Sequence, residues 1–305
     1  MKRVALVVAA ADVGERLDRF LAARGGISRG LARRAIDAGG VFVEGHRCKV
    51  ASRKVWPDQK VVANLEEGGR DASAPEPLDR ARLLYSDPHL AAIDKPAGVA
   101  AQATLTTDRG TLPALVAGLL DGPAILVHRL DRETSGVTLF ARTKAAAAAL
   151  AEAFRTGVPQ KTYLALCAKA PTPPEGRIAE PLGKDVHRAG LRCVDPRGEA
   201  AATRYRTLRT GAHGALVEAQ PETGRTHQIR IHLAHLGASL LGDPRYGGPR
   251  RVGEQRIPRV MLHAARLALP HPVTGAPMVF EAPIPEDFAA AEQALVPPVT
   301  PSGSP

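Results

Sequence analysis

A charged segment enclosed by two apolar runs is the feature that most constrains how this chain folds. Residues 124–127 and 137–141 are apolar, and each run has the length of a buried β-strand. The segment between them is charged, and its end, Thr134–Gly136, is predicted to form the turn into the second strand. Charged side chains seldom lie so near a core unless they are paired or used in function. Asp131, with an arginine two residues before it and another directly after it, is therefore the first candidate for a functional residue.

The size and charge of the chain indicate a globular protein with a polyanionic partner. Its 305 residues can bury one large core or two unequal ones. The formal net charge is +10 and the isoelectric point is about 9.9, which favours nucleic acid as a partner ahead of an anionic membrane surface. No apolar run approaches the roughly 18 residues of a membrane span.

Two features predict a cytoplasmic protein. The apolar run at residues 4–11 is short, and acidic residues follow it directly, so it is predicted to be a first β-strand rather than a signal peptide. Cys48, Cys167 and Cys193 are odd in number and far apart, which argues against a disulfide framework and fits a reducing compartment. Because no CxxC pair occurs, a cysteine zinc site is not expected.

The N-terminal part of the chain concentrates the positive charge. Residues 1–70 carry 14 Lys and Arg against 8 Asp and Glu, so more than half of the excess charge lies in less than a quarter of the chain. Leu17, Phe20 and Leu21 share one face of a predicted helix. Ser28 is a plausible N-cap for a second helix, after which residues alternate as two short strands.

This pattern resembles the small RNA-binding domain first seen in ribosomal protein S-four. The matching segments are residues 16–21, 27–36 and 40–45. The resemblance implies that Arg29, Arg33 and Arg34 contact RNA phosphates. The alternative is an ordinary amphipathic helix whose arginines face solvent. Glu44 departs from the pattern, since the family often has asparagine before the turn glycine.

The rest of the chain predicts a linker, a second domain and a tail. We place the RNA-binding domain at residues 1–68, a Gly-, Pro- and acid-rich linker at 69–79, a catalytic domain at 80–290 and a disordered tail at 291–305. Strands are predicted at 83–85, 90–93, 161–168, 202–206 and 216–219, and helices at 111–120 and 144–154. Many strands with scattered helices indicate an α+β fold, a small N-terminal α/β domain followed by a domain with a mixed, largely antiparallel central sheet.

Residues 223–232 hold a second group of polar side chains. They alternate and are predicted to form a strand, with Gln228, Arg230 and His232 on one face. An arginine beside a carboxylate favours its ionised form, and an ionised aspartate kept dry is a usable nucleophile or base.

Five motifs in order resemble the RluA family of pseudouridine synthases. They lie at residues 128–131 with 134–136, 161–165, 224–232, 242–247 and 262–264. The resemblance covers roughly residues 80–287, and the N-terminal domain is one that this family commonly carries. It implies an enzyme that detaches uracil from its ribose within RNA, turns the base and rejoins it through carbon, with no cofactor and no metal.

The resemblance also implies residue roles. Asp131 is the catalytic aspartate, which attacks the anomeric carbon or the base or removes a sugar proton. Tyr163 stacks on the flipped uracil or helps to deprotonate its ring carbon, and Arg230 pairs with Asp131. Three further residues contact the substrate, namely Arg129 and His227 on the splayed RNA and Ile229 beside the base.

Other interpretations stay open at this stage. Asp131 and Tyr163 could be structural, the protein could bind RNA without activity, or His227, His232 and His235 could hold a metal in a hydrolase, although no HExxH spacing occurs. The expected partner is ribosomal RNA of the large subunit, with transfer RNA as the alternative. We expect a monomer that needs no protein partner and no membrane.

Overall fold

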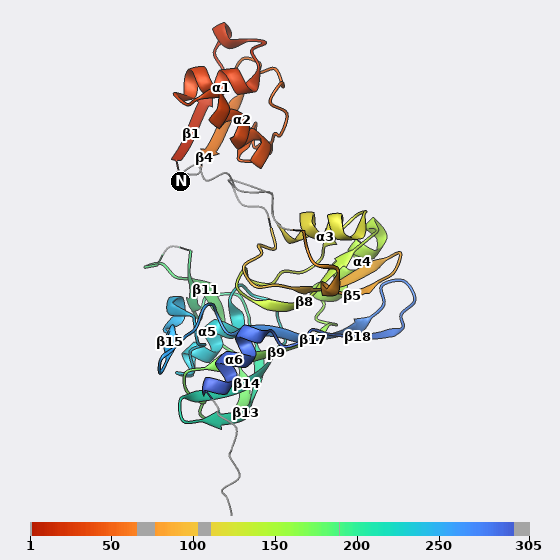
Figure 1. Cartoon of the computed structure of the whole chain (residues 1–305), viewed down its shortest axis with the longest axis vertical. Coiled ribbons are helices and arrows are strands. Elements are labelled where there is room, and N and C mark those ends of the chain that lie inside the picture. The colour runs from red at the N-terminus through yellow and green to blue at the C-terminus, as the bar shows by residue number, and fades with distance from the viewer. Residues whose placement is uncertain (1, 66–76, 103–110, 189, 296–305) are drawn as a thin grey trace, which may run out of the picture. The chain divides into compact units, whose positions relative to one another are not determined.

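The structure, a computed structural model, describes residues 2–65, 77–102, 111–188 and 190–295. The chain divides into two units, Met1–Leu78 with Ala100–Leu119 and Asp79–Val99 with Leu120–Pro305 (Figure 1). Most of the predicted linker at 69–79 lies outside the described residues.

The first unit contains a four-stranded antiparallel sheet with strand order β1-β4-β2-β3. The strands are β1 (Lys2–Val7), β2 (Val41–Val43), β3 (His46–Arg47) and β4 (Lys60–Leu65). The helices are η1 (Ala10–Asp12), α1 (Leu17–Gly25), α2 (Arg29–Ala38) and α3 (Leu112–Leu120). The strand predicted near the N-terminus is thus present as β1, paired along its whole length with β4.

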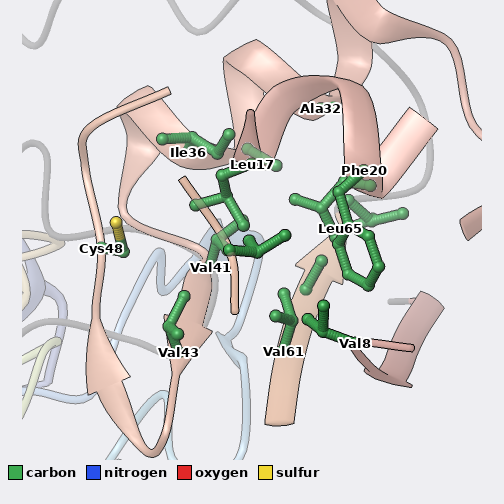
Figure 2. Packing of buried hydrophobic residues seen from close by; sticks show 14 residues of the cluster. Val8, Leu17, Phe20, Ala32, Ile36, Val41, Val43, Cys48, Val61 and Leu65 are labelled. Carbon is green, nitrogen blue, oxygen red and sulfur yellow. The ribbon is translucent and has the colours of Figure 1, made fainter. Parts of the chain in front are cut away.

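The core of this unit lies between α1, α2 and the sheet, as Figure 2 shows. Leu17, Phe20 and Leu21 are buried on one face of α1, as their spacing predicts. Ser28 caps α2, because its hydroxyl accepts a hydrogen bond from the Leu31 amide (3.1 Å). These local signals were strong enough for the sequence to place both helices.

The β2–β3 hairpin explains the departure at Glu44. Glu44 and Gly45 both adopt positive φ angles, 51° and 77°. A two-residue hairpin loop of this kind matches the right-handed twist of its strands, and asparagine tolerates positive φ better than glutamate. Glu44 therefore preserves the hairpin but strains its first turn position.

The second unit is built on a ten-stranded sheet, so the prediction of a mixed, largely antiparallel sheet is confirmed. Its order is β10-β13-β14-β9-β17-β8-β6-β5, with β18 paired to β17 and β7 paired to β8. The strands are β5 (Leu83–Ser86), β6 (Leu90–Lys95), β7 (Ile125–Leu126), β8 (Ser135–Ala141), β9 (Gln160–Cys167), β10 (Glu175–Ile178), β13 (Thr203–Gly211), β14 (Gly214–Pro221), β17 (Leu262–Pro270) and β18 (Pro277–Glu281). Only the β8–β17 pair is parallel.

Shorter elements surround this sheet. The helices are η2 (Arg80–Arg82), α4 (Lys144–Arg155), α5 (Gln228–His235), η3 (Pro244–Tyr246) and α6 (Glu286–Leu295). Two small hairpins are formed by β11 (Leu182–Lys184) with β12 (Arg192–Val194) and by β15 (Arg251–Val252) with β16 (Gln255–Arg256). None of the helices in the described ranges is long and apolar enough to cross a membrane.

The centre of the sheet corrects one sequence prediction. Ser135 and Gly136, predicted to lie in a turn, are the first residues of β8 and are buried. Gly136 pairs with Ala264 of β17, and an added Cβ at Gly136 would overlap the Ala264 carbonyl oxygen. The same Ala264 pairs with Tyr163 of β9 on its other side. Glycine is therefore needed because three strands meet closely there.

The segment predicted as a strand at 223–232 is instead a turn followed, from Gln228, by the helix α5. Its residues Gln228 to Leu233 are all buried. A helix that is buried on every side shows no amphipathic period, so its polar and apolar residues alternate in a way that imitates a strand. Gln228 donates to the Ala202 carbonyl (2.8 Å) and accepts from the Arg225 amide (2.9 Å), which satisfies its buried amide.

The predicted disordered tail begins too early. Helix α6 continues to Leu295, and Phe288, Ala291 and Leu295 are buried against the second unit's core. Residues 296–305 lie outside the described residues.

Candidate active site

Asp131 lies in the loop that joins β7 to β8, two strands paired with each other at Ile125 and Ala141. The loop starts with a structural histidine. The Nε2 atom of His128 accepts a hydrogen bond from the Leu139 amide (2.9 Å), and its ring stacks on Phe154 with centroids 4.5 Å apart. Burial lowers the pKa of His128 to about 3, so its ring is neutral and acts as an acceptor.

A buried lysine holds the end of the same loop. The Nζ atom of Lys95, in β6, donates to the carbonyl oxygens of Arg132 (3.0 Å), Thr134 (2.7 Å) and Pro96 (3.0 Å). Lys95 is fully buried, and this burial lowers its pKa to about 7. Lys95 thus serves the structure of the loop rather than an exposed phosphate site.

A buried arginine holds the carbonyl between those two. Arg259 donates from Nη1 to the Glu133 carbonyl (3.2 Å) and binds Asp287 of α6 through Nε (2.6 Å) and Nη2 (2.9 Å). The Glu133 carboxylate in turn accepts from the Val260 amide (3.3 Å). Three consecutive carbonyl groups directly after Asp131 are therefore fixed by two buried cations.

Arg230 joins Asp131 to a second aspartate. Its Nη1 lies 2.9 Å from Asp131 Oδ2, while Nε and Nη2 lie 2.7 and 2.9 Å from the two carboxylate oxygens of Asp243. Burial opposes the charge of Arg230, but the hydrogen bonds and charge of Asp243, with those of Asp131, outweigh it and raise the pKa of Arg230. The Asp243 side chain is 1% exposed and the Asp131 side chain is 26% exposed. Asp243 therefore anchors the arginine from the interior, and Asp131 faces outward.

The sequence reasoning assigned no role to Asp243. It lies in the matched motif 242–247, directly after Gly242. Gly242 has a φ of 74°, and an added Cβ there would overlap the Arg259 carbonyl. The one signal in the sequence was the place of Asp243 inside a motif that matches the family, since the crowding at Gly242 is seen only in the structure.

His227 completes the polar group around Asp131. Its Nε2 lies 3.7 Å from Asp131 Oδ2, and its Nδ1 is 2.7 Å from the hydroxyl of Tyr246. The guanidinium of Arg230 lies over the Tyr246 ring, 5.0 Å from its centroid. His227 has a positive φ of 60°, an uncommon conformation that is often found at functional sites. Burial lowers the pKa of His227, although the charge of Asp131 opposes this.

Tyr163 reaches the same site from β9. Burial, and then the negative charge of Asp131, raise the pKa of Tyr163, so its phenol is neutral. The ring packs against an apolar cluster that contains Ile229 and Leu233 of α5. Ile229 is buried with 5% exposure, whereas Arg129 is exposed on the loop.

The arginines predicted to contact phosphates lie on α2 of the first unit. Arg33 and Arg34 are exposed. Arg29 is half exposed and pairs with the fully buried Asp18 (3.0 Å), which also binds Arg16 (3.0 Å). Asp18 therefore fixes two arginines at the adjoining ends of α1 and α2.

Comparisons with known proteins identify the fold and its chemistry. Residues 89–235 match the family model described as RNA pseudouridylate synthase, and residues 15–61 match the S4 domain. A protein of Chloroflexus aurantiacus named as an uncharacterized RNA pseudouridine synthase is 40% identical, with 93% of this chain and 90% of that protein covered. This chain belongs to the RNA pseudouridylate synthase family.

Further relatives agree with this assignment. The ribosomal large subunit pseudouridine synthase C of Escherichia coli K12 is 32% identical to this synthase over 95% of this chain and 96% of its own length. The solved structure of the human RNA pseudouridylate synthase domain containing 4 is 30% identical, with a TM-score of 0.59, and covers 70% of this chain and 93% of its own. The chain is an RNA uridine isomerase with an N-terminal S4 domain.

Two of the three histidines considered as metal ligands, His227 and His232, have other hydrogen-bond partners. Both ring nitrogens of His232 are used, Nδ1 with the Thr203 hydroxyl (2.9 Å) and Nε2 with the Glu180 carbonyl (3.0 Å). Within residues 2–65, 77–102, 111–188 and 190–295, no group of three His, Cys, Asp or Glu side chains has a metal-binding arrangement.

Proposed function

We propose that Asp131 is the catalytic aspartate and acts directly on the target nucleotide. The observation that carries this proposal is its 2.9 Å ion pair with Arg230, an arginine that is itself locked to buried Asp243. Such a pair places a cation beside Asp131 and aims its carboxylate, while its remaining exposure leaves it open to substrate. An ionised, oriented carboxylate can attack the sugar or the base, or remove a proton from the sugar.

Tyr163, Arg129, His227 and Ile229 handle the nucleotide in this proposal. The target uridine must leave its stack to reach a carboxylate held between elements of the protein. A neutral phenol ring beside the aspartate suits stacking on uracil, and its raised pKa disfavours a role as a base in the free enzyme. Ile229 supports the Tyr163 ring, and exposed Arg129 with His227 holds the RNA on either side.

The proposed substrate is ribosomal RNA of the large subunit. The Escherichia coli relative is named for that subunit, and the S4 domain carries Arg29, Arg33 and Arg34 on α2 for phosphate contacts. The net charge of +10 supports a structured polyanion. In this proposal the protein works in the cytoplasm as a monomer, without a cofactor or a protein partner.

Replacement of the carboxylate tests the catalytic assignment. Pseudouridine formed in total RNA by purified wild type and by Asp131→Asn is measured by site-resolved mapping. Asp131→Asn is expected to form no product while it binds the same RNA, and Glu152→Gln, on the exposed face of α4, should behave as wild type. Equal product from wild type and Asp131→Asn would show that Asp131 is not the catalytic group.

Mapping in cells tests the substrate. A strain that lacks the gene should lose pseudouridine at defined positions of large-subunit RNA and regain it on expression of wild type. Loss confined to transfer RNA would replace the ribosomal assignment, and an unchanged profile with fully active protein would exclude both.

A further inference from the structure

A cavity lies beside the candidate active site in the same unit, between α5 and the β11–β12 hairpin. Its volume is about 300 Å³. The lining side chains are Arg188, Arg192, Cys193, Val194, Ile231, Ala234, His235 and Tyr246. None of the roles assigned above uses this cavity, although it is as large as the smaller ligand sites of proteins.

The chemistry of the lining is that of a nucleotide site. Ile231, Val194 and Ala234 give an apolar floor, and Tyr246 adds an aromatic ring. Unstacked bases in RNA complexes lie against aromatic rings and guanidinium planes. An apolar and aromatic floor with cationic groups at its edge suits a flat base that carries a phosphate.

The two arginines can serve a phosphate in spite of their acidic neighbours. Arg188 binds Asp185 through Nε (2.7 Å) and the Arg245 carbonyl through Nη1 (3.4 Å). Arg192 binds Glu199 through Nη1 (3.1 Å). A guanidinium has five N–H donors, so these bonds orient each side chain and leave donors for a ligand.

Tyr246 connects this cavity to Asp131. Its hydroxyl lies 2.7 Å from His227 Nδ1, and His227 Nε2 lies 3.7 Å from Asp131. The same hydroxyl accepts from the Arg192 amide (3.4 Å), which attaches the hairpin to the network. One side chain, that of His227, therefore separates the cavity wall at Tyr246 from the proposed catalytic carboxylate.

We propose that this cavity binds the base of a nucleotide next to the target uridine, with its phosphate on Arg188 and Arg192. A nucleotide joined to the target by one phosphodiester has to lie near the proposed catalytic carboxylate, and this cavity is a nearby space with matching chemistry. Binding there anchors the strand while the uridine enters the site and contributes to the choice of uridine. The proposal rests on the proposed function of Asp131.

Cys193 offers a direct probe, because Cys48 and Cys167 are buried and Cys193 is partly exposed in the cavity wall. The rate of Cys193 alkylation by iodoacetamide is measured by mass spectrometry on the full-length protein. Adenosine, guanosine, cytidine and uridine 5′-monophosphates are added in turn, and inorganic phosphate serves as the comparison. At least one nucleotide should slow alkylation several-fold, and phosphate alone should not.

Two variants test the site itself. In Ala234→Phe the added ring fills the cavity, and in Arg188→Ala/Arg192→Ala the phosphate donors are lost, so the ratio of rates with and without nucleotide should approach one in both. Ala149→Phe, at an exposed position of α4, is the matched control and should keep full protection. No protection of wild type by any nucleotide, or equal protection of Ala234→Phe, would overturn the proposal.

Substrate RNA then tests the link to catalysis. An abasic nucleotide at one of the two positions flanking the mapped uridine should weaken binding by wild type about tenfold, as the loss of one stacked base does. The same change should have no further effect in Ala234→Phe. Equal losses in both proteins would contradict the proposal, whereas a wild type that forms no pseudouridine would instead contradict the proposed function.

Discussion

At the scale of single residues, the site depends on one arginine shared by two carboxylates. Asp243 takes two of the donors of Arg230 and Asp131 takes a third. Only the planar fork of a guanidinium can serve both partners at once. The buried aspartate therefore fixes the direction in which the arginine presents its free edge to Asp131.

The first prediction concerns this geometry. Arg230→Lys keeps the charge beside Asp243 but loses the fork, so kcat should fall by roughly two orders of magnitude, since small misplacements cost that much. RNA affinity should change little, because Arg230 is almost fully buried. Single-turnover rates and binding titrations measure the two effects, and a parallel collapse of RNA affinity would contradict the pairing role.

The second prediction concerns the buried Lys95. Its pKa is lowered from 10.5 to about 7 in the folded protein, so the unfolded chain binds more protons between these values. The free energy of unfolding of wild type should therefore rise relative to that of Lys95→Met between pH 7 and pH 10, by up to about 1.4 kcal/mol per pH unit. Urea unfolding at several pH values measures this difference, and a flat difference would mean that Lys95 keeps its ordinary pKa.

At the residue scale, the contact that the family resemblance implied between two charged side chains is present. Asp131 and Arg230 were expected to meet and do so at 2.9 Å, although they are 99 positions apart. Asp243 and Tyr246 received no role, because their partners are set by the tight backbone around Gly242 and by the position of α5. Nothing in the local residue pattern encodes those tertiary contacts.

At the scale of elements, the loop after Asp131 is held from the sides of the two strands that flank β8 in the sheet, β6 and β17. Lys95 comes from β6, and Arg259 comes from the segment before β17 and is fixed by α6. The acceptors of Lys95 and of Arg259 in the loop are backbone carbonyls, so these bonds do not depend on the loop side chains. The Glu133 carboxylate adds one side-chain contact, since it accepts from the Val260 amide.

The third prediction follows from that support. Arg259→Met removes the bond to the Glu133 carbonyl and should lower kcat at least about tenfold with little change in RNA affinity. Amide hydrogen exchange should accelerate at residues 133–134 alone. A general loss of stability would instead accelerate exchange over the whole unit. Asp287→Asn should give the same effects more weakly, and Asp287→Asn combined with Arg259→Met should add little to Arg259→Met alone.

Elements were predictable from sequence where their burial was one-sided. The Ala-rich helix at 144–154 is present as α4, capped by the Thr143 hydroxyl, and the strand at 161–168 is β9. The buried helix α5 was predicted as a strand because its residues alternate. Ser135 and Gly136 were predicted as a turn, but they pair with β17 in the parallel ladder. Both errors arose where tertiary packing outweighed the local pattern.

At the scale of the whole molecule, the proposed function assigns RNA binding to the S4 domain and the chemistry to the synthase domain. The fourth prediction tests the first part of this division. Replacement of Arg29, Arg33 and Arg34 by alanine should reduce the salt dependence of RNA binding by about two to three in log K per log salt. An equal charge change at Arg155, Arg206 and Arg251, all exposed, should alter the slope less. If the salt-dependence slopes of the two variants were equal, the S4 domain arginines would not contribute to RNA binding.

The Arg259–Asp287 pair also bears on when the enzyme becomes active during synthesis. The loop at residues 132–134 is translated well before Arg259 and Asp287, which supply and orient its support. A nascent chain that has not yet released α6 from the ribosome therefore holds the loop after Asp131 through Lys95, but not through Arg259 oriented by Asp287. Under the proposed function, such a chain should isomerise uridine more slowly than a chain in which α6 has packed onto the second unit.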